Sequence, residues 1–481
     1  MPTSMSPVSD LTQCTAGELL QLYRERKASP VEATRAVLAR IDKLNTRLNA
    51  YCLVAHEEAL QSAAQSEARW AEGKPMGELD GVPVSIKDLI LTRGWPTLRG
   101  SHTVERKQAW DVDAPATARL REAGAVLMGK TTTPEFGCKG ETNSPLTGIT
   151  RNPWNTDKTP GGSSGGTAAA VAAGLGPLSV GTDGAGSVRI PAAFCGNFGL
   201  KPSFGRVPAY PLSPFGSVAH LGPHTMSVRD AALMLNVLKQ PDARDWTALP
   251  YDASDMLDGL ELGVRGLRIA YSPALGYAQA VVDPEVAASV AAAVRELEGL
   301  GAIVEQVDPG IEDSLDICTG LWFVGAWSVW NTLDAKQQAV TDPDFRAEAQ
   351  LGSQYTALDV QRLNQRRGLL GSHMRQFMQR YDLLVTPTVA VPAFDARPAG
   401  QIRMEPKSML GWTPFSYPFN LTPATRLHDP LRPDQVRPAH RPAVGRPDVR
   451  RRAGAACGTC LRTREADRTT CHAVTRVFQQ A

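Results

Sequence analysis

The sequence predicts an α/β fold on three observations. Apolar segments at 267–271 and 302–307, which are typical of strands, flank a helix that begins at Asp283. Near the middle of the chain, a helix of small residues at 167–173 is followed by a short strand at 178–182. The composition, with 42% hydrophobic and 21% charged residues in a chain of 481, is that of a globular protein able to bury a large core.

Residues 1–75 are predicted to form an N-terminal helical arm. Two capping boxes, each a Ser or Thr followed three residues later by Glu, begin helices at 16–27 and 30–46. The elements predicted after them are an apolar segment at 50–55, a helix ending near 72, a strand at 81–87, a helix from 113 to 124 and a strand at 125–128. A long helix at 358–381 and a strand at 382–389 are predicted near the other end.

Two glycine-rich loops carry serines, Ser163 in the first and Ser187 in the second. In the second loop, the amides of Gly184, Ala185, Gly186 and Ser187 follow one another where a helix begins. Successive N–H groups at a helix start form a cradle for negative charge. A hydroxyl inside such a cradle is well placed to attack a carbonyl, because the same amides would stabilise the oxyanion that develops.

These loops resemble the amidase signature family. The resemblance rests on three motifs. They are Gly-Gly-Ser-Ser-Gly-Gly at 161–166, Gly-Thr-Asp-Gly-Ala-Gly-Ser-Val-Arg-Ile-Pro at 181–191, and an apolar strand that ends in lysine and aspartate at 81–88. The resemblance implies a single large α/β domain at 76–422, with a mixed, mostly parallel central sheet covered by helices on both faces. It also implies amide hydrolysis through an acyl-enzyme.

Carried over residue by residue, the resemblance implies that Ser187 is the nucleophile, Ser163 relays its proton and Lys87 is the base. It further implies a cis peptide bond before Ser163. A lysine can act as a base only as the neutral amine, so its pKa must fall from about 10.4 toward about 7.5. Burial and neighbouring positive charge would be needed to lower it.

Three further residues are assigned to bracing the loops: Asp183, Arg189 and Ser164. In the family, the aspartate and the arginine beside the nucleophile hold its loop by hydrogen bonds. The alternative is that Asp183 and Arg189 form an exposed ion pair. Cys195, which lies close by, is interpreted as a small buried residue and not as a second nucleophile.

Two other motifs compete with this interpretation. The stretch 124–131 fits the phosphate-loop pattern letter for letter, but its variable positions are themselves a predicted strand, which argues against nucleotide binding. Both Ser163 and Ser164 also fit the Gly-x-Ser-x-Gly nucleophile elbow, which would need a histidine and an acid. His220, His224 and Asp230 could supply them. No long strand precedes the loop, so this mechanism stays the alternative.

We expect a small-molecule amide as substrate, no metal or organic cofactor, no membrane or nucleic-acid partner, and a cytoplasmic location. There is no run of 18 or more apolar residues, and the N-terminus has no secretory signal pattern. The eight cysteines have no framework spacing, so reduced thiols are expected. The sequence does not decide between a monomer and a homodimer. Aromatic residues at helical spacing are more typical of core than of a pocket, but they would favour aryl or alkyl amides if they lined the site: Trp322, Phe323, Trp327 and Trp330.

The resemblance ends at Thr422. Residues 423–481 contain twelve arginines and no lysine, and we interpret them as an atypical tail that is read out of frame. The spacing of the cysteines at 457, 460 and 471 does not match a known pattern of zinc ligands. A basic tail could also contact nucleic acid.

The leading hypothesis is a stand-alone amidase. One alternative is the A subunit of a tRNA-dependent amidotransferase, which usually has glutamine after the motif arginine and an aspartate–glutamine pair before the later Gly-Pro. Here these positions are Ile190, Ala219 and His220. The other alternative is an amidase-like protein that is inactive because of its tail.

Overall fold

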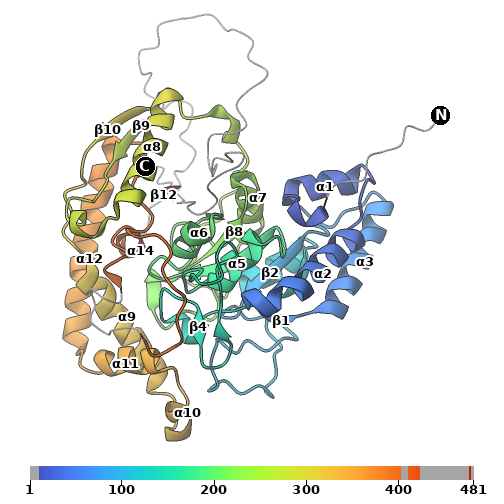
Figure 1. The fold of residues 1–481 in the computed structure, drawn as a ribbon, viewed down its shortest axis with the longest axis horizontal. Coiled ribbons are helices and arrows are strands. Elements are labelled where there is room, and N and C mark those ends of the chain that lie inside the picture. The colour runs from blue at the N-terminus through green and yellow to red at the C-terminus, as the bar shows by residue number, and fades with distance from the viewer. Residues whose placement is uncertain (1–9, 402–409, 423–475, 478–481) are drawn as a thin grey trace, which may run out of the picture.

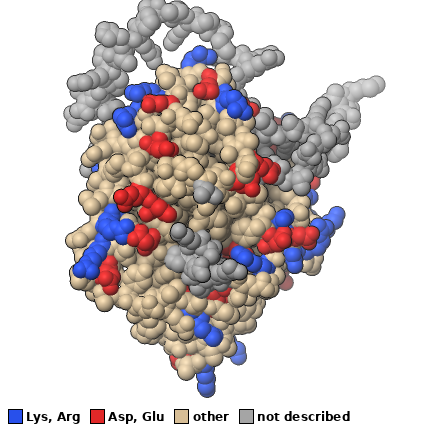
Figure 2. All heavy atoms as spheres, turned by 60° about the vertical axis from the view of Figure 1, so that its left-hand side comes forward, with Lys and Arg blue, Asp and Glu red and all other residues tan. Residues whose placement is uncertain are grey.

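The computed structural model describes residues 10–401, 410–422 and 476–477. The atypical tail therefore lies almost wholly outside the described residues. The described strands form three β-sheets, of six, four and two strands. Helices lie around the sheets (Figure 1). On the face shown in Figure 2, acidic and basic side chains are interspersed among neutral ones. No helix in the described ranges is both long enough and apolar enough to cross a membrane.

The N-terminal helices form as predicted. α1 (Ala16–Arg24) and α2 (Pro30–Leu48) each begin with a complete capping box, and α3 (His56–Ala71) follows. Between α2 and α3, β1 (Tyr51–Val54) pairs antiparallel with β3 (Val126–Thr131). The N-terminal arm is thus joined to the central sheet through β1.

The central sheet has six strands in the order β1-β3-β2-β6-β8-β7. The strands not yet given are β2 (Pro83–Lys87), β6 (Leu178–Asp183), β7 (Phe198–Gly199) and β8 (His220–Thr225). The prediction of a mixed sheet is confirmed. However, only the β2–β3 and β2–β6 pairs are parallel, and the other three pairs are antiparallel, so the expectation of a mostly parallel sheet is wrong.

Helices cover both faces of this sheet, as predicted. Side chains of α1, α4 (Pro115–Glu122) and α7 (Val228–Leu238) pack with those of β2 and β6 in one buried cluster. Side chains of α2, α3 and α5 (Gly165–Ala172) pack on β1 and β3 in another. The two clusters alternate along β3, because successive side chains of a strand point to opposite faces. Leu127 belongs to the first cluster, and Val126 and Met128 belong to the second.

The second half of the chain builds a smaller sheet in the order β10-β9-β11-β12. β9 (Arg268–Tyr271), α8 (Pro284–Gly299) and β10 (Ile303–Gln306) form the predicted strand–helix–strand unit with parallel strands. β11 (Leu383–Val385) also runs parallel to β9, and β12 (Arg476–Val477) pairs antiparallel with β11. The described residues therefore form this four-stranded sheet, and a sheet of two short strands, in addition to the predicted central sheet.

The aromatic stripe lies on α9 (Leu315–Trp330), which packs with α11 (Pro343–Gly352), α12 (Ala357–Phe377) and α14 (Pro418–Leu421). Trp322, Phe323 and Trp330 are buried in one apolar cluster, as expected for core residues. Trp322 stacks on Phe215 with 4.0 Å between ring centroids. Its indole also lies against the nucleophile loop, because a Cβ on Gly184 would come within 2.6 Å of it.

Candidate active site

Lys87 is the last residue of β2, which is buried between β3 and β6. Val84 and Ile86 pack the strand into the core, and the side chain of Lys87 is itself fully buried. Its Nζ lies 2.7 Å from Ser163 Oγ, 3.0 Å from Ser164 Oγ and 2.8 Å from Thr182 Oγ1. The contact between Lys87 and Ser163 is the one that the base and relay roles require.

The surroundings of Lys87 favour the neutral amine. Burial lowers the pKa of Lys87 well below its usual range, because the protein interior solvates an ammonium poorly. The expectation that neighbouring positive charge contributes is wrong. The charge that acts on Lys87 is the carboxylate of Asp183, which raises its pKa and so opposes the effect of burial.

The two loop serines lie beside each other but their hydroxyls are not joined. The Gly162–Ser163 peptide bond is cis, as the resemblance implies. The amide of Ser164 donates to the main-chain carbonyl of Ser187 at 3.1 Å, which ties the two loops together. Within the described chain, no hydrogen bond connects Ser163 Oγ with Ser187 Oγ. Catalytic hydrogen bonds are often long in an unliganded enzyme and shorten when substrate binds.

The carboxylate of Asp183 organises the second loop. It accepts hydrogen bonds from the amide of Gly186 at 2.7 Å and from the amide of Val188 at 3.2 Å. The amide of Gly186 is therefore already paired, and the expectation that it faces an incoming oxygen is wrong. In the described structure, the amides of Gly184, Ala185 and Ser187 make no hydrogen bond. These three remain as candidates for an oxyanion hole.

Asp183 and Arg189 form a buried ion pair and not an exposed one. Arg189 Nε lies 2.9 Å from Asp183 Oδ2, and both side chains are almost fully buried. The guanidinium holds the pKa of Asp183 well below its usual range. Ser164 braces the site differently, because its hydroxyl donates to the carbonyl of Thr182 while accepting from the Thr182 amide.

Three residues of this site were missed by sequence reasoning. Thr182, a contact of Lys87, lies inside the second glycine motif, so its position next to Asp183 was a usable signal. Ser416 and Asn420 contact Arg189 from more than 220 residues away. Nothing in the local sequence around them points to that contact.

The residues of the nucleophile-elbow alternative are bonded to other groups, although His220 Nδ1 also lies 3.2 Å from the carbonyl of Asp183. His220 Nδ1 lies 2.8 Å from the carbonyl of Val218, and His224 Nδ1 lies 3.3 Å from Asn197 Oδ1. Asp230 accepts from the amides of Ala16 and Gly17 at the start of α1. None of the three is bonded to either loop serine, so the structure does not assemble a Ser-His-Asp triad.

The two remaining motifs carry no site among the described residues. The phosphate-loop pattern at 124–131 is mostly strand β3, and Lys130 is buried with its Nζ 2.6 Å from the carbonyl of Ile90. Cys195 is buried, and burial raises its pKa, as expected for a structural thiol. No group of three His, Cys, Asp or Glu side chains in the described ranges is placed to hold a metal ion. The cysteines at 457, 460 and 471 lie outside those ranges.

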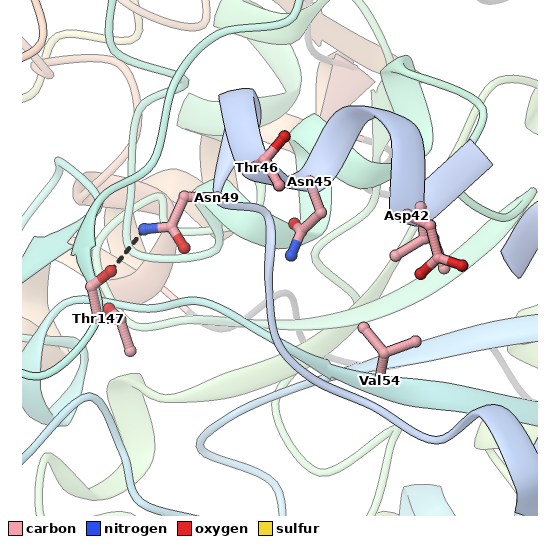
Figure 3. A pocket seen from close by; sticks show the side chains of 7 residues that line it. Asp42, Asn45, Thr46, Asn49, Val54 and Thr147 are labelled. Carbon is pink, nitrogen blue, oxygen red and sulfur yellow. Dashed lines mark hydrogen bonds between the residues drawn. The ribbon is translucent and has the colours of Figure 1, made fainter. Parts of the chain in front are cut away.

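A separate hollow of about 400 Å³ lies at the surface beside the end of α2 (Figure 3). Polar side chains line it, including Asp42, Asn45 and Asn49. Asn49 closes one side by donating to the carbonyl of Thr147 at 2.5 Å. None of the predicted catalytic residues lines this hollow.

Comparison with known proteins decides the family. A family model described as Amidase matches residues 32–438, which reaches beyond Thr422, where the resemblance was expected to end. The chain belongs to the amidase family. It is 37% identical over 414 residues to an acylamidase of Rhodococcus erythropolis, covering 85% of this chain and 86% of that one. This amidase is therefore a hydrolase of amide carbon–nitrogen bonds.

Two further relatives define how close the amidase is to each branch of the family. It is 34% identical over 443 residues to the A subunit of a glutamyl-tRNA(Gln) amidotransferase from Chloroflexus aurantiacus, covering 87% of this chain and 90% of that one. Its fold matches the crystal structure of a bacterial aryl acylamidase of the amidase signature family with a TM-score of 0.79 and 30% identity, covering 85% of this chain and 88% of that one.

Proposed function

We propose that this amidase acts alone on a carboxylic amide, releasing an acid and an amine through an acyl-enzyme on Ser187. The observation that carries the proposal is the 2.7 Å contact between Lys87 Nζ and Ser163 Oγ, in a buried setting that lowers the pKa of the lysine. A buried neutral amine against an alcohol is the arrangement that a general base requires.

In the proposed reaction, Ser187 Oγ attacks the amide carbonyl while its proton passes to Ser163 and the proton of Ser163 passes to Lys87. The oxyanion faces the free amides of Gly184, Ala185 and Ser187, which stabilise it. The carbon–nitrogen bond then breaks, and the proton held at Lys87 returns through Ser163 to the departing amine. Water attacks the ester by the same route and releases the acid.

Proton transfer between the serines requires a hydrogen bond that the described structure does not contain. The Ser164 amide already donates to the Ser187 carbonyl, which holds the two loops next to each other. We infer that bound substrate brings the two hydroxyls together.

The relatives described as acylamidase and aryl acylamidase support a substrate that is an acylated amine. We therefore propose aryl or alkyl amides as substrates.

The alternative is the A subunit of an amidotransferase, which the Chloroflexus relative favours. Against it stand Ile190 and His220, at positions where that protein usually has glutamine. A third hypothesis is that the protein is inactive, because its sequence at 423–481 is atypical of the family.

Purified full-length protein incubated with a panel of aryl and aliphatic amides, without glutamine or tRNA, tests these readings. We expect amine release and a mass increase equal to the acyl group on the peptide that contains Ser187. The Ser187→Ala variant should show neither. Hydrolysis that appears only with partner subunits would favour the amidotransferase, and a folded protein that turns over no amide would favour the inactive reading.

A further inference from the structure

A segment near the end of the described chain holds the loop that carries the proposed nucleophile. Ser416 lies just before α14, and Asn420 lies within it. The contacts of Ser416 with Ala185 and of Asn420 with Arg189 each span 231 residues of sequence. Both side chains are fully buried, so water cannot replace the bonds they make.

Ser416 contacts the residues on both sides of Ser187. Its hydroxyl donates to the carbonyl of Ala185 at 2.7 Å, and its own carbonyl accepts from Arg189 at 3.0 Å. Gly186 packs so closely against it that an added Cβ would come within 2.6 Å of the Ser416 Cβ. The path of the loop between 185 and 189 is therefore set from outside the loop.

Asn420 acts on the carboxylate that orders the same loop. Its Nδ2 lies 2.9 Å from Asp183 Oδ1 and 3.0 Å from the Asp183 carbonyl, and its Oδ1 accepts from Arg189 at 2.6 Å. An arginine can only donate and an ionised carboxylate can only accept, so the orientation of the amide is fixed by its partners. Asn420 thus ties together both members of the buried ion pair.

We propose that Ser416 and Asn420 are positioning residues for amide hydrolysis. They hold the 183–189 loop so that the free amides of Ala185 and Ser187 point at the oxyanion while the Ser187 hydroxyl meets the carbonyl carbon. This inference rests on the proposed role of Ser187. A displaced loop would weaken the interactions made in the transition state more than those made with bound substrate, so the effect belongs in kcat.

The Ser416→Ala variant tests this with Thr422→Val as its matched control. Each variant loses one buried hydroxyl of the same segment, but the hydrogen bond of the Thr422 hydroxyl goes to the carbonyl of Pro418 and not to the 183–189 loop. Both variants should fold, and thermal unfolding measures the stability that each one loses. Only Ser416→Ala should lose kcat, by about 10- to 100-fold with KM nearly unchanged. Asn420→Ala should lose at least as much.

A second readout is the rate at which a serine-directed fluorophosphonate modifies Ser187, which reports the loop geometry without an amide substrate. It should fall in Ser416→Ala and stay near wild type in Thr422→Val. Equal kcat and equal modification rates in the two variants would overturn the positioning role. A Ser187→Ala variant that still hydrolyses amides would instead overturn the proposed function. Ser416→Ala loses only one hydroxyl, so we expect this variant to fold. It therefore tests the positioning role even if Asn420→Ala does not fold.

Discussion

Lys87 Nζ and Ser163 Oγ lie 2.7 Å apart although 76 residues separate them in the sequence. The contact follows from the register of two parallel strands, in which Ile86 pairs with Val180 and the ends of β2 and β6 meet at one edge of the sheet. The first glycine loop leads into α5 at the same edge. A lysine at a strand end is thereby enclosed by three hydroxyls that belong to two other segments.

Replacing Lys87 by alanine should lower kcat by about 10³-fold or more, because no other basic side chain among the described residues is hydrogen-bonded to Ser163. The measurement is steady-state hydrolysis of an aryl amide. His220→Asn serves as the comparison, since an asparagine amide can still donate to the Val218 carbonyl that His220 Nδ1 contacts. This variant should keep most activity. Strong loss in His220→Asn with little loss in Lys87→Ala would support the nucleophile-elbow mechanism instead.

The rate should rise with pH through the pKa of Lys87 and then level off. Burial lowers that pKa, and only the neutral amine accepts a proton, so activity is present above the pKa and is lost as pH falls through it. A profile of kcat/KM against pH measures this limb. Burial also lowers the pKa of Lys201 to about 7, so Lys201→Met is the control. The rise of kcat/KM with pH should persist in Lys201→Met. If the rise disappears in that variant, it belongs to Lys201 and not to Lys87.

Asp183→Asn should abolish most activity and cost about 3–5 kcal/mol in the free energy of unfolding. The change leaves the buried Arg189 guanidinium without its charge partner and alters the group that holds the Gly186 amide. Urea unfolding and kcat measure the two effects. Asp316→Asn removes one partner of the exposed pair with Arg366 and should cost less than about 1 kcal/mol. Similar losses in both variants would contradict the bracing role of Asp183.

Gly186→Ala should impair both folding and catalysis. Gly186 has a φ of 121°, a backbone angle that residues with a Cβ rarely adopt. A Cβ added there would lie 2.5 Å from Ser416 Oγ and 2.8 Å from Ile190 Cδ1. Gly73→Ala separates the two causes, because Gly73 also has a positive φ of 70° but open space around it. It should cost about 1–2 kcal/mol with normal kcat. A Gly186→Ala enzyme as active as Gly73→Ala would show that the loop tolerates displacement.

Local signals predicted many of the helices and strands, but they missed others such as α7 and β8, and they did not predict how the strands are paired. The capping boxes place the starts of α1 and α2 correctly, because a cap depends on residues within one turn. β3 extends to Thr131, three residues past the predicted end, because Lys130 and Thr131 pair with β2, which the local apolar pattern could not reveal. The mostly antiparallel order of the central sheet depends on the path of the loops between strands, which periodicity does not encode.

By itself, the sequence determined the chemistry of the candidate site: two serines in glycine loops, a lysine at a strand end and an Asp–Arg pair beside one serine. These follow from motifs whose members lie close together along the chain. Only the tertiary structure decided that the Gly186 amide is already bonded to Asp183 and that Ser416 and Asn420 hold the loop. A hydrogen bond is directional and short, so which donors remain free for a ligand depends on groups that folding brings from hundreds of residues away.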